Sequence, residues 1–332
     1  MAVDAYGQTP YYQGKTITII QGRSAGGTGD LRVRAIMPLL QKYIPGDPTI
    51  VNEYMVGGGG RKATNHLFRT SRPDGLTIGN MGIGMVSAAI LGETGVLYDL
   101  DKLNYLGAPL STRHTVFLTR GELGLTSLGK LQGTSGIRIG AESVGHSGYI
   151  EGRFFAWLLG LKEPRFVTGY ASAEIDAALL RGEVDAHSTN SDSVVNRYPE
   201  WLDKKLMHFH ANLPVPKGHT HPRFTHLPDV DKFAGTSLQQ RVLAMHRAFR
   251  LPGQPFIAPP GVPQEQLKIL QEAFRKAYND PEFHANYKKL VGDDPSPLMP
   301  EELERAVREM PRDAETVDLY KRIAGHGALP RR

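Results

Sequence analysis

The sequence has 332 residues, 40% of them hydrophobic and 22% charged, and its formal net charge is +5 at pH 7. This length predicts two domains, each with its own core. The small charge excess comes without a long basic run, so we expect no nucleic-acid partner, and a mild positive charge suits small acidic ligands. The absence of cysteine excludes disulfides and thiol chemistry.

A glycine-rich loop near the start is the feature around which the first domain is organised. An apolar segment at 17–20 precedes it, and an amphipathic helical pattern at 33–44 follows. The loop contains Ser24, Ala25, Gly26, Gly27 and Thr28. Glycine lets a ligand approach the backbone, and the first amides of a helix lack partners within it, so such a loop attracts anions. The alternative is an ordinary connection between a strand and a helix.

The same pattern recurs twice within the next sixty or so residues. A predicted strand at 48–53 leads to four consecutive glycines at 57–60 and a helix from about Arg61, and a strand at 76–80 leads to Gly82-Ile83-Gly84. The glycine run favours a loop that brings amides to a ligand, with a flexible linker as the alternative. Loops that follow parallel strands gather at one sheet edge, where ligands bind.

The second half repeats this arrangement with polar side chains added. A strand at 137–140 is followed by a loop and by an apolar helix at 150–161. The loop contains Ser143, Gly145, His146 and Ser147. A helix at 172–181 then precedes a strand at 184–189, which ends beside Asp192.

The remaining segments are predicted from composition and pattern. We expect a histidine-rich surface loop at 203–235, whose spacing matches no recognised metal site, so no metal is expected. Helices are predicted at 280–290 and 300–323. The expected domains are 1–110 for a first lobe, 111–250 for a second, and 251–332 for the return to the first lobe with the C-terminal helices.

The order of these segments resembles the extracytoplasmic solute receptors of tripartite tricarboxylate transporters, the Bug or TctC family. The segments that carry the resemblance are 24–30, 57–60, 73–79, 169–170, 178–185 and 256–263. The resemblance implies an α/β, two-lobed, periplasmic-binding-protein-like fold. Each lobe would be a mainly parallel sheet flanked by helices, and hinge motion near 107–115 and 248–256 would close the lobes over a small carboxylate.

The resemblance also implies which residues bind the ligand. They are Ser24, Ala25, Gly26, Gly27, Thr28, Gly58, Gly59, Gly60, Arg61, Gly84, Ser143, Gly145, His146, Ser147 and Asp192. The sequence departs from the family pattern at Arg23, at Arg61-Lys62 and in the histidine-rich segment.

Several of these residues have a second interpretation. Arg23 and Arg61 either clamp a second carboxylate or remain solvated. The hydroxyl groups of Ser24, Thr28, Ser143 and Ser147 either donate to the ligand or cap helices. His146 is a donor, a pH sensor or an ordinary loop residue. Asp192 either accepts from the ligand or caps the next helix.

The implied function is a periplasmic receptor, with its signal peptide already removed, that delivers a carboxylate to membrane transporter subunits. We expect a monomer without cofactor, metal or catalytic residues. The segment at 145–149 fails the G-x-S-x-G pattern because Tyr149 occupies the last position. The alternatives are a cytoplasmic α/β enzyme acting on an organic acid and the ligand-sensing domain of a signalling system.

Overall fold

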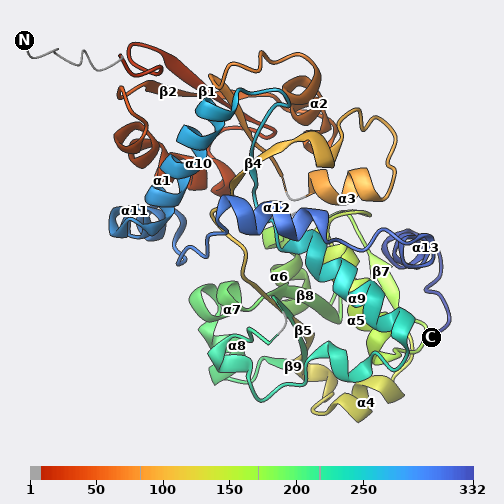
Figure 1. Ribbon diagram of the computed structural model, residues 1–332. Helices are drawn as coiled ribbons and strands as arrows, with labels where there is room; N and C mark the ends of the chain where they lie inside the picture. Colours follow the sequence, from red (N-terminus) through yellow and green to blue (C-terminus); the bar gives the residue numbers. More distant parts are fainter. Residues whose placement is uncertain (1–8, 83, 171, 217) are drawn as a thin grey trace, which may run out of the picture. The chain divides into compact units, whose positions relative to one another are not determined.

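The computed structural model describes residues 9–82, 84–170, 172–216 and 218–332. Contacts within the chain divide it into two units. The first unit combines Met1–Ser111 with Ala248–Met310, and the second combines Thr112–Arg247 with Pro311–Arg332. Each unit has its own five-stranded sheet (Figure 1).

In the first unit, three consecutive parallel strands carry the glycine loops. The sheet order is β2 (Thr49–Tyr54), β1 (Thr16–Gln21), β3 (Thr77–Asn80), β10 (Phe256–Ala258) and β4 (Asn104–Gly107). Strand β1 pairs in parallel with both β2 and β3, whereas β10 is antiparallel to both of its neighbours. The chain therefore turns from one side of β1 to the other between β2 and β3, which creates a topological switch point between β1 and β3.

Helices cover both faces of this sheet. One face packs against α1 (Thr28–Tyr43), α10 (Gln264–Asn279) and α11 (Pro281–Val291), whose apolar residues share a core with Ile78. Gly79, the next residue of β3, instead faces Leu67 of α2 (Arg61–Arg69). Successive strand residues point to opposite faces, so α1 and α2 lie on opposite sides. The shorter α3 (Gly84–Ile90) follows β3, and α12 (Pro300–Arg308) packs against β4.

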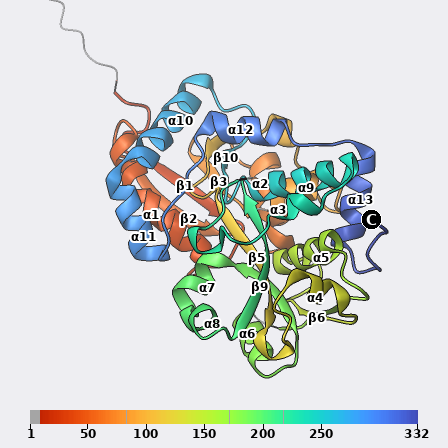
Figure 2. The same ribbon diagram turned by 90° about the horizontal axis from the view of Figure 1, so that it is seen from below.

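The second unit repeats this topology. Its sheet order is β7 (Arg165–Val167), β6 (Arg138–Gly140), β8 (Ala186–Asn190), β5 (Arg113–Arg120) and β9 (Met207–Val215). Strand β6 is parallel to β7 and β8, and β5 is the one strand of this sheet that runs in the opposite direction. Strand β10 is the corresponding reversed strand in the first unit. Figure 2 shows the long pair β5 and β9 side by side. The expected mainly parallel α/β fold is thus confirmed in both units.

The helices of the second unit come from several parts of the chain. They are α4 (Leu128–Gly133), α5 (Ser147–Leu159), α6 (Ser172–Leu180), α7 (Ser191–Arg197), α8 (Pro199–Asp203), α9 (Ser237–Arg250) and α13 (Ala314–Ala324). Helix α5 connects β6 to β7 and is buried along nearly its whole length, because α13 packs against it. It thus takes the place in this topology that α1 has in the first unit.

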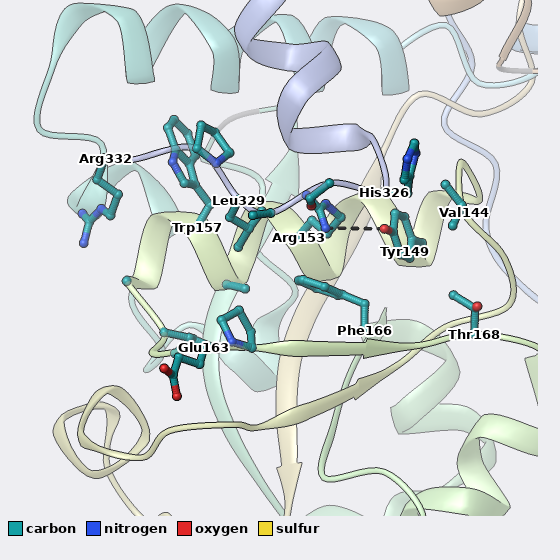
Figure 3. Close-up of a pocket in the computed structure, with 17 residues that line it drawn as sticks. Val144, Tyr149, Arg153, Trp157, Glu163, Phe166, Thr168, His326, Leu329 and Arg332 are labelled. Carbon is teal, nitrogen blue, oxygen red and sulfur yellow. Dashed lines mark hydrogen bonds between the residues drawn. The ribbon is translucent and has the colours of Figure 1, made fainter.

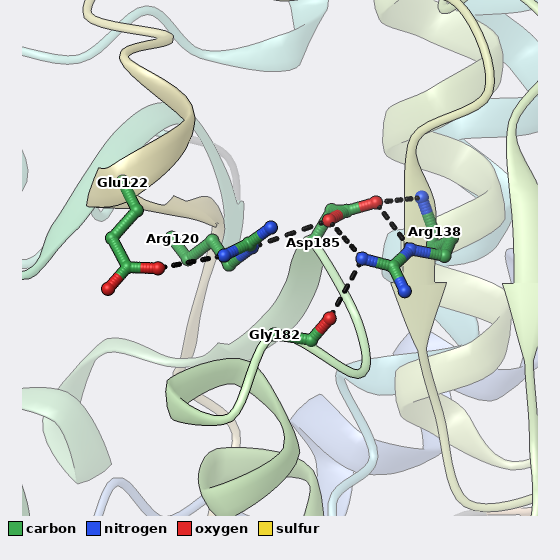
Figure 4. A network of polar contacts seen from close by, with 5 residues as sticks. All are labelled: Arg120, Glu122, Arg138, Gly182 and Asp185. Atoms are coloured by element: carbon green, nitrogen blue, oxygen red, sulfur yellow. Dashed lines mark hydrogen bonds and ion pairs between the residues drawn. The ribbon is translucent and has the colours of Figure 1, made fainter.

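A charged network fixes the amino end of β6 (Figure 4). The two carboxylate oxygens of Asp185 accept from Nη2 and Nε of Arg138, at 2.7 and 2.8 Å, and one also accepts from the Arg138 backbone N–H at 3.0 Å. Burial raises the pKa of Asp185, but these bonds outweigh burial and lower it. Because this bidentate pair sets how β6 and β8 meet, it also positions the loops at their carboxyl ends.

Three expectations from the sequence are wrong. The helix predicted at 300–323 is two helices, α12 and α13, because Pro311 interrupts the pattern and Asp313 caps a new helix by accepting from the Thr316 N–H at 3.0 Å. Residues 311–332 then pack with the second unit, not the first. The segment at 203–235 is also only partly loop, since it begins with β9.

Candidate functional site

The three glycine loops of the first unit meet at the carboxyl ends of β1, β2 and β3. A Cβ placed on Gly22 would lie 3.1 Å from the Cα of Gly60, so the first two loops touch through their backbones. The Gly22 N–H donates to the Asn80 carbonyl at 3.4 Å, which ties the first loop to the end of β3. The sequence therefore predicted correctly that these loops gather at one edge.

The first loop presents its backbone to solvent. Ser24, Ala25, Gly26, Gly27 and Thr28 are all exposed. Gly27 is the N-cap of α1 and has an extended backbone, and no side chain caps the helix there. The first amides of a 16-residue helix are consequently left for water or a ligand, at the positive end of its dipole. Gly26 has φ +83°, a value that favours glycine.

A buried carboxylate holds this loop from within. Asp30 has no exposed side-chain surface and accepts from the Gly26 N–H, the Tyr54 hydroxyl, Gln21 and Arg34. Burial raises the pKa of Asp30, but these four hydrogen bonds outweigh it and lower the pKa to about 2. The loop is therefore fixed by a charge that persists throughout the neutral range.

The glycine run is a defined turn, which argues against the flexible-linker interpretation. Gly57, Gly58, Gly59 and Gly60 have φ values of +138°, +56°, +63° and +92°. Four consecutive left-handed or unusual conformations would strain any other residue. They form a short 3₁₀ turn that leads into α2, whose N-terminus also lacks a side-chain cap.

The arginines near these loops already have partners. Arg23 donates to Oδ1 of Asn80 at 2.7 Å and to the carbonyl of Gly29 at 3.1 Å, and burial, followed by repulsion from Arg32, lowers its pKa to about 10. Arg61 is paired with Glu93 at 2.5 Å. Arg23 thus acts as a brace between β3 and the first loop, while Arg61 can reach a ligand only by releasing Glu93.

The third loop contributes less to the site. Gly84 is exposed at the start of the seven-residue helix α3. Ile83 lies outside the described residues.

The second unit places a similar loop after β6. Gly145 has φ +84°, close to the value at Gly26, and α5 begins at Ser147. Ser143, Gly145 and His146 are exposed, and Ser147 is half-buried. Here the N-cap is His146, whose Nδ1 accepts the Gly148 N–H at 3.3 Å while Nε2 lies 2.9 Å from Glu142. The structure thus uses His146 as a helix cap.

Asp192 lies at the same sheet edge, where β8 ends and β5 begins. Its two carboxylate oxygens face Nδ1 of His114 at 3.4 Å and Nε2 of His221 at 3.5 Å. Asn190, not Asp192, caps α7. Sequence reasoning missed His114 because it is 78 residues away from Asp192, and only the antiparallel pairing of β5 with β8 brings them together.

A buried histidine lies beneath this edge. His187 on β8 is 7% exposed, and its Nδ1 is 3.0 Å from the Gly140 carbonyl. Burial lowers the pKa of His187 to about 4, so it is neutral at pH 7 and donates this bond. It fixes the end of β6 and contributes no charge to the site.

Within the described ranges, no group of three or more His, Asp or Glu side chains is arranged to hold a metal ion. In the same part of the chain, no helix is both long and apolar enough to cross a membrane.

The sequence matches no protein-family model and no curated protein. The fold, however, is shared with solved periplasmic binding proteins. They include BugD (18% identity, TM-score 0.62, covering 95% of this chain and 99% of that one). They also include a TctC solute-binding protein from Polaromonas (14% identity, TM-score 0.69, covering 94% of this chain and 98% of that one). A third is MatC from Rhodopseudomonas palustris, solved with bound malate (19% identity, TM-score 0.59, covering 94% of this chain and 99% of that one). At these identities the likeness concerns the fold.

Proposed function

We propose that the protein is a solute-binding receptor that captures a small carboxylate through the glycine loops of the first unit. The observation that carries this proposal is the contact between the loops at Gly22 and Gly60, each leading into a helix whose N-terminus lacks a side-chain cap. Such an arrangement serves recognition of an anion, and the structural neighbours BugD and the TctC protein are named binding proteins, so we propose a receptor and not an enzyme.

The energetics suit reversible capture. A hydrogen bond to a charged group contributes roughly 1.5–3 kcal/mol. Several converging amides, reduced by the cost of ordering the ligand, give a dissociation constant on the order of a micromolar, or about −8 kcal/mol. The network under Asp30 holds the first loop in place before the ligand arrives, which lowers the ordering cost.

The shared fold supports a dicarboxylate or hydroxy acid as the ligand class, because MatC was solved with malate. In this chain Ser143 and Ser147 are the available hydroxyl donors of the second unit, and Asp192 is occupied by His114 and His221. We propose that Asp192 orients these two imidazoles, and its contact with the ligand stays a prediction.

The names of the structural neighbours support a place for this chain in the Bug or TctC family and in the periplasm. On that basis we propose that the loaded receptor delivers its ligand to the membrane subunits of a transporter. Association of the loaded protein with such subunits in reconstituted membranes tests this step, and no ligand-dependent association would contradict it.

The site itself is tested by ligand screening followed by calorimetry. A thermal-shift screen of organic acids identifies the ligand by a concentration-dependent rise in melting temperature. Gly27→Val should then abolish binding, because Gly27 is the N-cap of α1 and a branched side chain there would shield the uncapped amides of the first helical turn. The added Cβ meets no neighbour within 4 Å, so the fold should be retained. Gly129→Val in α4, where the added side chain also meets nothing, is the matched control. Equal affinity of the two variants would remove the first loop from the site.

A further inference from the structure

A cavity lies wholly within the second unit, between α5, β7 and the C-terminal segment 326–332 (Figure 3). Its volume is about 620 Å³, within the range of small-molecule pockets. It extends along α5 from Val144, before the helix, to Gly160, after it. None of the ligand-binding residues expected from the sequence lines it.

Arg153 is the central feature of this cavity. It lines the cavity yet is only 1% exposed. Its guanidinium donates to the carbonyls of Ile323, Arg322 and Gly327 and to the hydroxyl of Tyr149, the last at 3.4 Å. All four acceptors are neutral. Among the described residues no carboxylate pairs with Arg153, and burial lowers its pKa.

A buried cation without a counter-charge is costly. Part of the charge is balanced by the carboxyl end of α13, where two of the accepting carbonyls lie, and by the ring faces of Phe166 and Tyr149, 4.8 and 5.5 Å away. A guanidinium has five N–H groups, and the bonds within the described residues leave a second N–H on Nη1 for another acceptor.

The rest of the wall combines apolar and aromatic side chains with polar ones, among them the carboxylate of Glu163. Trp157, Phe166 and Leu329 line it, and Figure 3 shows Phe166 extending from β7 toward Arg153. The indole N–H of Trp157 is buried and has no hydrogen-bond partner among the residues that the structure describes. Arg332 adds a second cation at the lining. A ligand that fits this wall has an anionic head and an apolar body.

We propose that this cavity is an accessory binding site for a small amphipathic monocarboxylate, an aryl or short acyl acid. The carboxylate supplies the counter-charge that Arg153 lacks, and the apolar body packs between Phe166 and Trp157. No residue of the first unit's glycine loops lines the site.

Phenylacetate and hexanoate are suitable test compounds, and phenylacetamide is the matched neutral control. The chain has two tryptophans, and Trp201→Phe leaves Trp157 as the only indole. We expect both acids to change the emission of Trp157 saturably and phenylacetamide to bind at least tenfold more weakly. Calorimetry on the unmodified protein provides the same comparison without that substitution. No saturable signal with either acid, or equal binding of the amide, would overturn the proposal.

Two variants locate the binding. Arg153→Gln should weaken the binding of both acids at least tenfold, but it also removes the hydrogen bonds that hold the C-terminal segment. Ala328→Phe leaves Arg153 intact and fills the cavity from an exposed position in the lining, and it should also abolish binding. Gly27→Val should bind the acids normally, so failure of this proposal is distinguishable from failure of the receptor function. Unchanged affinity in Ala328→Phe would contradict the assignment of the cavity.

Discussion

Replacing Asp30 with Asn tests how the first loop is held. The substitution keeps the shape but removes the charge and turns one acceptor into a donor, facing the Gly26 N–H, Tyr54 and Arg34. The pKa of Asp30 is about 2, against an ordinary value of 3.8. This difference corresponds to roughly 2.5 kcal/mol of stability. Because Arg34 is half exposed, solvent screens part of it, and we expect a loss of about 1.5 kcal/mol at pH 7.

The effect of Asp30→Asn on stability should also depend on pH in a defined direction. A carboxyl whose pKa is lowered on folding stabilises the protein above pH 3.8 and loses that contribution as the pH falls toward 2. The difference between the wild-type protein and Asp30→Asn should therefore shrink across this window. Amide hydrogen exchange in α1 reports it locally, with Asp318→Asn, an exposed aspartate of α13, as the control for charge removal. A difference below about 0.5 kcal/mol at pH 7, or one that does not shrink on acidification, would refute the reasoning.

Three further predictions concern the scaffold. His187 has a pKa of about 4 in the folded protein and 6.5 in the unfolded chain, so the folded protein loses stability as the pH falls from 6.5 to 4. In His187→Gln the urea-denaturation midpoint should therefore depend less on pH across that range. An unchanged pH dependence would contradict this. Gly58→Ala should destabilise by about 1 kcal/mol because φ is +56°, whereas Gly27→Ala should be nearly neutral, and equal melting temperatures would argue against the strained turn. Asp185→Asn should cost about 2 kcal/mol in chemical denaturation by leaving Arg138 without its counter-charge, and a loss under 0.5 kcal/mol would show that the pair is dispensable.

The sequence predicted the part of the fold that local pattern controls. Apolar strands followed by glycine and amphipathic helices identified β1 with α1 and β6 with α5, and the parallel arrangement then placed their loops at sheet edges. The positive φ values at 57–60 could be anticipated because glycine adopts them far more readily than other residues.

Long-range contacts could not be predicted in the same way. Nothing near Arg23 in the sequence shows that Asn80 will occupy its guanidinium, and the pairing of His114 with Asp192 depends on the register of β5 against β8. The last helix was misassigned because its amphipathic pattern shows that it packs, but not against which unit.

The most direct test of the central claim is a titration of protein labelled with ¹⁵N-glycine, followed by the backbone amide signals. On addition of the acid found by screening, malate being the first to try, the amides of Gly27 and Gly59 should shift in saturable steps with one common affinity. Signals that move only at glycines remote from these loops, such as Gly160 or Gly327, would show that bare loop amides do not hold the carboxylate.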